Sequence, residues 1–357
     1  MKMEDKSNPI RLLARMINVL LIIVVVVLIL VLGLCSMILI GPNRIAKWYD
    51  TKEERPTSTT IGNTKSEIWM APDLSKISKD ENGKLIEYGL ALISHTAQYL
   101  GPNGSVKKIS NGMNCQNCHL EAGTKPFGNN YSAVASTYPK FRARSGTEET
   151  IERRVNDCLE RSLNGVALEN DSHEMKAIVA YLQWLGSDVA KGVAPKGSGL
   201  LALDFLDRPA SIENGKIVYE SKCLICHGVN GEGMALQDGT GYQYPPLWGN
   251  QSYNKGAGLF RLSRFAGYVK ANMPFGASYL SPQLTDEEAW DVAAFVNSLP
   301  RPDKDLGKDW PDISKKPFDH PFGPYIDGFE EVQHKYGPFK PIQEKLKAMS
   351  SRKQVSP

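Results

Sequence analysis

The chain has 357 residues, of which 41% are hydrophobic and 23% are charged, with 42 Lys and Arg against 39 Asp and Glu. This length is too great for one small domain and predicts two or three. A formal net charge of +3 and the lack of a basic stripe or nucleic-acid motif exclude a polyanion as the expected partner.

The N-terminal segment contains an uncharged run from Val19 to Ile40. About 20 apolar residues are needed to cross a bilayer, and these 22 are longer than the usual apolar core of a signal peptide. Basic residues precede the run, which favours an N-terminus on the cytoplasmic side. We therefore expect residues 1–41 to form an anchor with a single uncleaved transmembrane helix. The rest would then lie on the periplasmic side of the cytoplasmic membrane.

The remainder of the chain repeats one plan, in which helical patterns flank a short cysteine motif. Helices are expected over residues 85–100 and 173–186 in the first block, and over 284–299 in the second. The expected divisions are a polar linker (42–66), a first domain (67–195), a joint rich in Pro and Gly (193–199), a second domain (200–300) and a Pro-rich, irregular extension (301–357). Strand-like alternation is scarce, so the fold class is predicted to be all-α.

Each block contains a CxxCH motif. Two thiols at this spacing can add to the two vinyl groups of one haem, and the adjacent histidine can bind its iron, so the pattern is typical of c-type haem attachment. The residues are Cys115, Cys118 and His119 in the first block, and Cys223, Cys226 and His227 in the second. A zinc site would need further paired ligands, and the sequence offers none nearby. We expect two covalently bound haem c groups in two tandem cytochrome c-like domains.

The iron-bound histidine of such a site usually donates its second N–H to a carbonyl or carboxylate. The stretch "YPPLWGN" (244–250) is similar to the loop that performs this function in class I cytochromes c, and Pro246 is the candidate acceptor. In the first block the corresponding candidate is Pro139, which could equally be a plain turn residue.

The second haem has a clear candidate for its sixth ligand. Met273 lies in "VKANMPFG" (269–276), a loop rather than a helix face. Ligation by methionine and histidine raises the reduction potential, as suits an electron-transfer haem. Lys270, three residues earlier, is the alternative ligand.

The first block lacks such a methionine, because Met175 has the helical spacing of a core residue. Its candidate is Cys158, in the predicted helix "RVNDCLERSLNG" (154–165). At 100° per residue Cys158 falls on the expected buried face, with Arg154 and Arg161 along one edge. A buried cysteine is often only a small apolar residue. Next to iron and guanidinium groups, however, it would be a thiolate, which should lower the haem potential.

Several stretches together resemble the dihaem thiosulfate dehydrogenase family, among them "NGMNCQNCHLEAGTKPFGNNYSAVASTYPKFRARSG", "RVNDCLERSLNG", "YPPLWGNQSYNKGAGLFRLSRFAGYVKANMPFG", "LTDEEAWDVAAFVNS" and "HKYGPF". The resemblance spans about residues 67–342. It implies an enzyme that couples two thiosulfates to tetrathionate, reversibly, and passes electrons to an external cytochrome or oxidase. It also implies that His119 and Cys158 ligate the active-site haem, that His227 and Met273 ligate the electron-transfer haem, and that Arg144, Arg154, Ser162 and Arg142 line a basic substrate pocket.

Two other functions stay open at this point. One is a membrane-tethered dihaem cytochrome that carries electrons and has no substrate. The other is a haem subunit of a Sox-type sulfur-oxidation system, which also uses a cysteine-ligated haem but needs a partner subunit. The spectrum of the first haem distinguishes the enzyme from the electron carrier, because a thiolate-ligated haem has distinct bands. Activity of the isolated chain toward thiosulfate distinguishes the enzyme from the Sox-type subunit.

Overall fold

The structure is a computed structural model that describes residues 16–28 and 68–355. The chain divides into two units, Met1–Thr64 and Lys65–Pro357. In the first unit, residues 16–28 form a helix. Residues 29–40 of the predicted membrane span, with Cys35, and the linker 42–66 lie outside the described residues. Within the described stretches, no helix is both long enough and apolar enough to cross a membrane.

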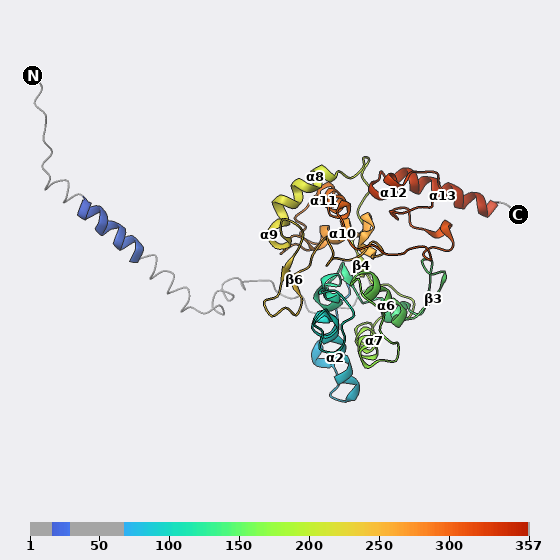
Figure 1. Cartoon of the computed structure of the whole chain (residues 1–357), viewed down its shortest axis with the longest axis horizontal. Coiled ribbons are helices and arrows are strands. Elements are labelled where there is room, and N and C mark those ends of the chain that lie inside the picture. The colour runs from blue at the N-terminus through green and yellow to red at the C-terminus, as the bar shows by residue number, and fades with distance from the viewer. Residues whose placement is uncertain (1–15, 29–67, 356–357) are drawn as a thin grey trace, which may run out of the picture. The chain divides into compact units, whose positions relative to one another are not determined.

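The second unit contains two groups of helices that follow each other along the chain (Figure 1). The first group comprises α2 (Glu81–Ser94), α3 (Thr96–Leu100), α4 (Leu120–Gly123), α5 (Val134–Thr137), α6 (Ile151–Arg161) and α7 (His173–Leu185). The second comprises α8 (Ile212–Lys222), α9 (Leu224–His227), α10 (Leu262–Asn272) and α11 (Asp286–Ser298). The expected helices at 85–100, 173–186 and 284–299 are therefore present, although the first is divided into α2 and α3 at His95.

Both groups contain a pair of helices that cross at a glycine. In the first, a Cβ on Gly89 of α2 would lie 2.0 Å from the carbonyl oxygen of Ala177 in α7. In the second, a Cβ on Gly215 of α8 would lie 1.9 Å from the carbonyl oxygen of Asp291 in α11. Only glycine permits such a close approach of two backbones. The repeated plan seen in the sequence is thus a repeated helix crossing.

The ends of α11 show why the sequence forms a helix there. Thr285 accepts a hydrogen bond from the backbone N–H of Glu288, and the Glu288 side chain accepts one from the N–H of Thr285. This reciprocal pair satisfies two donors that a helix start leaves without partners. The pattern of Thr285 followed three residues later by Glu288 is the sequence signature of this cap.

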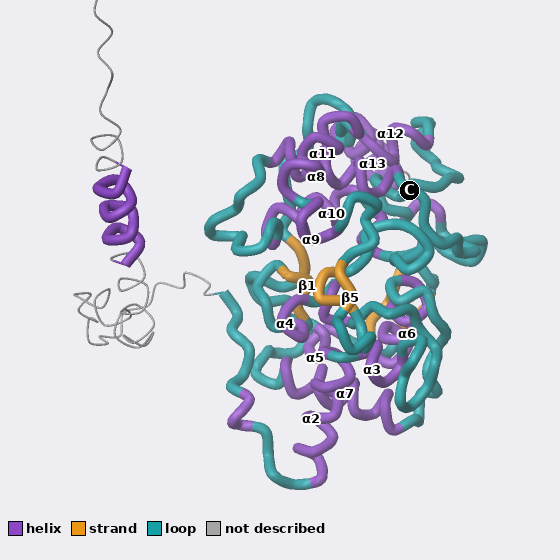
Figure 2. Tube along the Cα trace, turned by 60° about the vertical axis from the view of Figure 1, so that its left-hand side comes forward, coloured by secondary structure: helices purple, strands orange, loops and turns teal. Residues whose placement is uncertain are grey.

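Strands are few and short, as expected of an all-α fold. Three antiparallel pairs are formed by β1 (Gly128–Asn130) with β4 (Gly199–Leu200), β2 (Lys140–Arg142) with β3 (Thr147–Glu149), and β5 (Met234–Ala235) with β6 (Tyr242–Tyr244). Figure 2 shows β1 and β5 between the two groups of helices. The 3₁₀ turns are η2 (Leu74–Lys76), η3 (Cys115–Asn117), η4 (Gly258–Phe260) and η5 (Ile313–Lys315).

The C-terminal extension is irregular only in its first part. It ends in α12 (Glu331–Tyr336) and α13 (Lys340–Val355), so the expectation of an irregular extension throughout is wrong. Pro341 does not prevent α13, because proline is tolerated in the first turn, where its missing N–H would have no helical partner.

Candidate functional site

The second CxxCH motif begins where α8 ends. Cys223 caps α8, and the short α9 carries the motif to His227, which is buried. The His227 Nδ1–H donates to the carbonyl oxygen of Pro245, 3.0 Å away. The predicted acceptor, Pro246, is wrong by one residue, because in this turn it is the preceding carbonyl that faces the ring.

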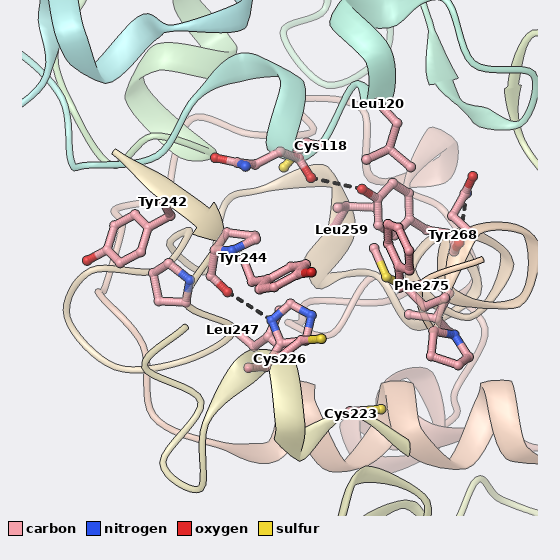
Figure 3. Close-up of a pocket in the computed structure, with 18 of the residues that line it drawn as sticks. Cys118, Leu120, Cys223, Cys226, Tyr242, Tyr244, Leu247, Leu259, Tyr268 and Phe275 are labelled. Atoms are coloured by element: carbon pink, nitrogen blue, oxygen red, sulfur yellow. Dashed lines mark hydrogen bonds between the residues drawn. The ribbon is translucent and has the colours of Figure 1, made fainter. Parts of the chain in front are cut away.

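This motif opens onto a cavity of about 660 Å³. Figure 3 shows Cys223 and Cys226 on one side of it and Cys118 and Leu120 on the other. Met273, which caps the C-terminal end of α10, also lines the cavity, together with His227. The apolar part of the lining includes Leu259, Phe265, Val269, Leu284, Val292 and Val296. The two thiols and the imidazole of this motif, with the Met273 thioether, surround one apolar space and fit a haem held as predicted.

Lys270, the alternative ligand, is engaged elsewhere. Its ammonium donates to the carbonyl oxygen of Leu284 at 2.7 Å and pairs with Asp286 at 2.6 Å. The arrangement therefore favours Met273 over Lys270 as the residue available to the iron.

The first CxxCH motif is formed by η3 and the residues that follow it. Burial, with a smaller contribution from the nearby Arg154 charge, lowers the pKa of His119 to about 4. The His119 ring donates from Nδ1 to the carbonyl oxygen of Asn129, 2.5 Å away, and stacks on Tyr131. Pro139, the predicted acceptor, is wrong, because the strand β1 rather than the later proline turn reaches the histidine. The result is a neutral imidazole with one nitrogen fixed and the other available to a metal.

Cys158 lies on α6, which begins after the N-cap Thr150. The cysteine is half-buried rather than fully buried. Its charge adds to burial in raising the pKa values of the Cys115 and Cys118 thiols, so it lies near the first haem-attachment motif. Cys158 is also the main cause that raises the pKa of Arg154, one turn earlier on the same helix. The structure therefore brings together the cysteine, the arginine and the first CxxCH motif.

Arg144 and Arg161 meet a carboxylate from the C-terminal extension. Arg161, only 9% exposed, forms two hydrogen bonds of 2.8 Å with Asp309. Arg144 lies 3.9 Å from the same carboxylate and donates to the carbonyl oxygen of Gly256 at 2.8 Å. Burial and the Arg161 charge lower the pKa of Arg144 to about 10. Arg144, predicted to line the pocket, thus shares a buried charge network with the second domain and the extension.

Arg142 and Ser162 are placed less deeply. Arg142 ends β2, and its Nε lies 3.9 Å from an oxygen of Glu149, whose carboxylate is buried. That oxygen has no hydrogen-bond partner. Glu149 therefore offsets the charge of Arg142 but does not hold its guanidinium in one orientation. Ser162 caps α6, and its backbone N–H donates to the Cys158 carbonyl. It therefore lies one turn from the cysteine.

Arg264 was missed by reasoning from the sequence. It comes from α10 of the second domain, and its pKa is lowered by burial, then by Arg261, and also by Arg154 and Arg142. More than a third of its surface nevertheless stays open to solvent. The basic "RLSR" stretch (261–264) was the available signal, but nothing local connected it to a helix of the other domain.

Comparison with known proteins agrees with this arrangement. The family model described as SoxA/TsdA, cytochrome c domain matches residues 105–190, and the model described as Cytochrome c matches residues 212–300. A thiosulfate dehydrogenase of Psychrobacter arcticus is 42% identical over 241 residues, which are 67% of this chain and 71% of the relative. The chain belongs to the thiosulfate dehydrogenase family. Its two cytochrome c domains carry two covalently bound haem c groups.

Other members of the thiosulfate dehydrogenase family extend the match. The Allochromatium vinosum enzyme is 41% identical, over 54% of this chain and 72% of its own. The Stutzerimonas stutzeri enzyme is 32% identical, over 74% of this chain and 83% of its own. The solved thiosulfate dehydrogenase (TsdBA) from Marichromatium purpuratum, in its as-isolated form, superposes with a TM-score of 0.62 at 27% identity. The match covers 77% of this chain and 55% of that one.

Proposed function

We propose that the chain oxidises two thiosulfates to one tetrathionate, reversibly, and passes the two electrons through its two haems to an external cytochrome or oxidase. The reaction joins two sulfane sulfurs, and one S–S bond forms as two electrons leave. The observation that carries the proposal is the placement of Cys158 and Arg154 beside the first CxxCH motif.

The proposed ligands differ between the two haems. We assign His119 and Cys158 to the first and His227 and Met273 to the second. When bound, each haem supplies reversible one-electron chemistry. The Asn129 and Pro245 carbonyls hold the two imidazoles in orientation, and a thiolate ligand keeps the potential of the first haem lower than a methionine would.

The cationic side chains account for the substrate. Thiosulfate is a dianion, and two of them repel each other when they approach. Arg154, Arg142 and Arg264 lie near one another and offset this repulsion through charge-assisted hydrogen bonds to the sulfonate oxygens. Arg144 and Ser162 complete the proposed pocket, with Arg144 held in place by Gly256 and Asp309.

The proposal includes the location of the enzyme. We propose a single-pass tether in the cytoplasmic membrane, with both haem domains on the periplasmic side. The uncharged run of 22 residues from Val19 to Ile40 and the basic residues before it support this. Membrane fractions washed with alkaline carbonate should retain the full chain and release a variant that lacks residues 1–41. Release of both would contradict the tether.

A paired assay tests the chemistry. The purified holoprotein should reduce ferricyanide with thiosulfate and oxidise a reduced dye with tetrathionate, and Cys158→Gly should lose both activities. Haem reduction without tetrathionate formation would instead indicate an electron carrier. Activity that appears only after a partner subunit is added would indicate a Sox-type component.

A further inference from the structure

A tyrosine of the second domain contacts the first haem-attachment motif directly. Tyr268 lies on α10, is 4% exposed, and lines the cavity that contains His227 and Met273. Its hydroxyl donates to the carbonyl oxygen of Asn117 at 2.8 Å. Asn117 lies between the two cysteines of the first CxxCH motif. Figure 3 shows the Tyr268 ring beside Cys118 and Leu120, across the cavity from Cys223.

A second contact fixes the same helix one turn later. The Asn272 side-chain amide donates to the carbonyl oxygen of Phe127 in the first domain at 3.1 Å, and to that of Tyr268 at 2.9 Å. Asn272 immediately precedes Met273. The helix segment that ends in the proposed ligand of the second haem is therefore bonded twice to the first domain.

These contacts bear on how electrons cross between the domains. Tunnelling weakens exponentially with each through-space gap and far less across covalent and hydrogen bonds. The Asn117 carbonyl is covalently continuous with Cys118, and the Tyr268 ring lies in the wall of the second cavity. The hydrogen bond thus replaces a van der Waals gap at the point where the domains meet.

We propose that Tyr268 is a positioning residue for electron transfer between the two haems, acting through its hydrogen bond to Asn117. One electron crosses at a time, oxidising a ferrous first haem and reducing a ferric second one, and the hydroxyl keeps its proton throughout. Burial raises the pKa of Tyr268 well above 10, consistent with a hydroxyl that stays protonated. The inference rests on the two-haem path of the proposed function but not on the identity of the substrate.

The test is Tyr268→Phe in the full-length holoprotein. This change keeps the ring in the cavity wall and removes only the donor. The oxidised protein is given single electrons by pulse radiolysis, and the equilibration between the two haems is followed optically. We expect the rate to fall severalfold, because the tunnelling path must then cross a through-space gap where the hydrogen bond to Asn117 was. Both haem potentials and ligand spectra should stay as in the wild type.

Tyr181→Phe is the matched control. Tyr181 is also buried, and its hydroxyl donates to a backbone carbonyl, that of Ala122, at 2.9 Å, but within the first domain. An unchanged equilibration rate in Tyr268→Phe would overturn the proposal. So would equal slowing in Tyr181→Phe, or slowing accompanied by a shifted haem potential. Because no thiosulfate is added, these results are independent of whether the protein turns over that substrate.

Discussion

The two CxxCH motifs are built alike but have different surroundings. Around the second, the cavity is lined mostly by apolar residues, and Met273 is the proposed sulfur ligand. Around the first, Cys158 is the proposed sulfur ligand, and Arg154 lies one turn away on the same helix. In the proposed function the same attachment chemistry serves two purposes. Apolar walls suit the passing of an electron without ligand chemistry, whereas the proposed cysteine ligand among guanidiniums suits the binding and joining of small sulfur oxyanions.

The largest effect is expected from replacing the proposed sulfur ligand of the first haem. Cys158→Gly should lower thiosulfate turnover by roughly 10³-fold or more, because it removes the proposed ligand at the reacting site. Met273→Leu should slow turnover less and leave the optical and electron paramagnetic resonance signature of the first haem intact. Steady-state assays and low-temperature spectra of both holoproteins measure this. A fully active Cys158→Gly enzyme would contradict the assignment.

The next effect concerns the contact between the extension and the first domain. Asp309→Ala should lower the free energy of unfolding by about 3–5 kcal/mol, because it leaves Arg161 buried without its main partner. Denaturant titration measures the change. Asp303→Ala is the control, because its pair with Lys255 lies at the surface and should matter little. A similar loss of unfolding free energy in the two variants would show that the buried Arg161–Asp309 pair stabilises the protein no more than a surface pair does.

A smaller effect tests the cationic surroundings of the first haem. Arg154→Ala should reduce kcat/KM for thiosulfate by roughly 10- to 150-fold, equivalent to about 1.5–3 kcal/mol for hydrogen bonds to a charged group. Arg153→Ala, at the exposed neighbouring position, should leave kcat/KM nearly unchanged. If both variants behave alike, general surface charge rather than the pocket attracts the substrate.

The smallest effect appears only in acid. Burial lowers the pKa of His320 in the extension to about 4, against 6.5 for the ordinary side chain. Between these values the unfolded chain binds a proton that the folded chain does not. Stability is therefore full above pH 6.5 and declines as the pH falls, by about 2 kcal/mol at pH 5. His320→Gln should flatten this slope in thermal unfolding measured from pH 5 to 8, and an unchanged slope would assign it to other groups.

Features encoded locally could be predicted from the sequence. The haem motifs depend on spacing alone, and the α11 cap depends on Thr285 and Glu288, three residues apart. Cys158 could be singled out as a candidate from its position on a predicted helix among arginines. Its chemical role stays a prediction, as do the roles of Met273 and the arginines.

Features that depend on the path of the chain could not be predicted. The carbonyl groups that hold the two histidines belong to Asn129 and Pro245, because a turn decides which backbone oxygen points inward. Arg264 reaches the Arg154 cluster from another domain, and Asp309 reaches Arg161 from 148 residues further along the chain. The periodicity of a sequence does not indicate which distant residues come into contact.

The bonds from Asp309 to Arg161, and from the backbone N–H of Trp310 to the Arg144 carbonyl, have a consequence for biosynthesis. A ribosome that has completed both haem domains has not yet supplied the carboxylate that holds two of the arginines. A chain that stops before residue 309 would retain both haem-attachment motifs and lack this brace. Haem attachment and the bracing of these arginines therefore depend on different parts of the chain.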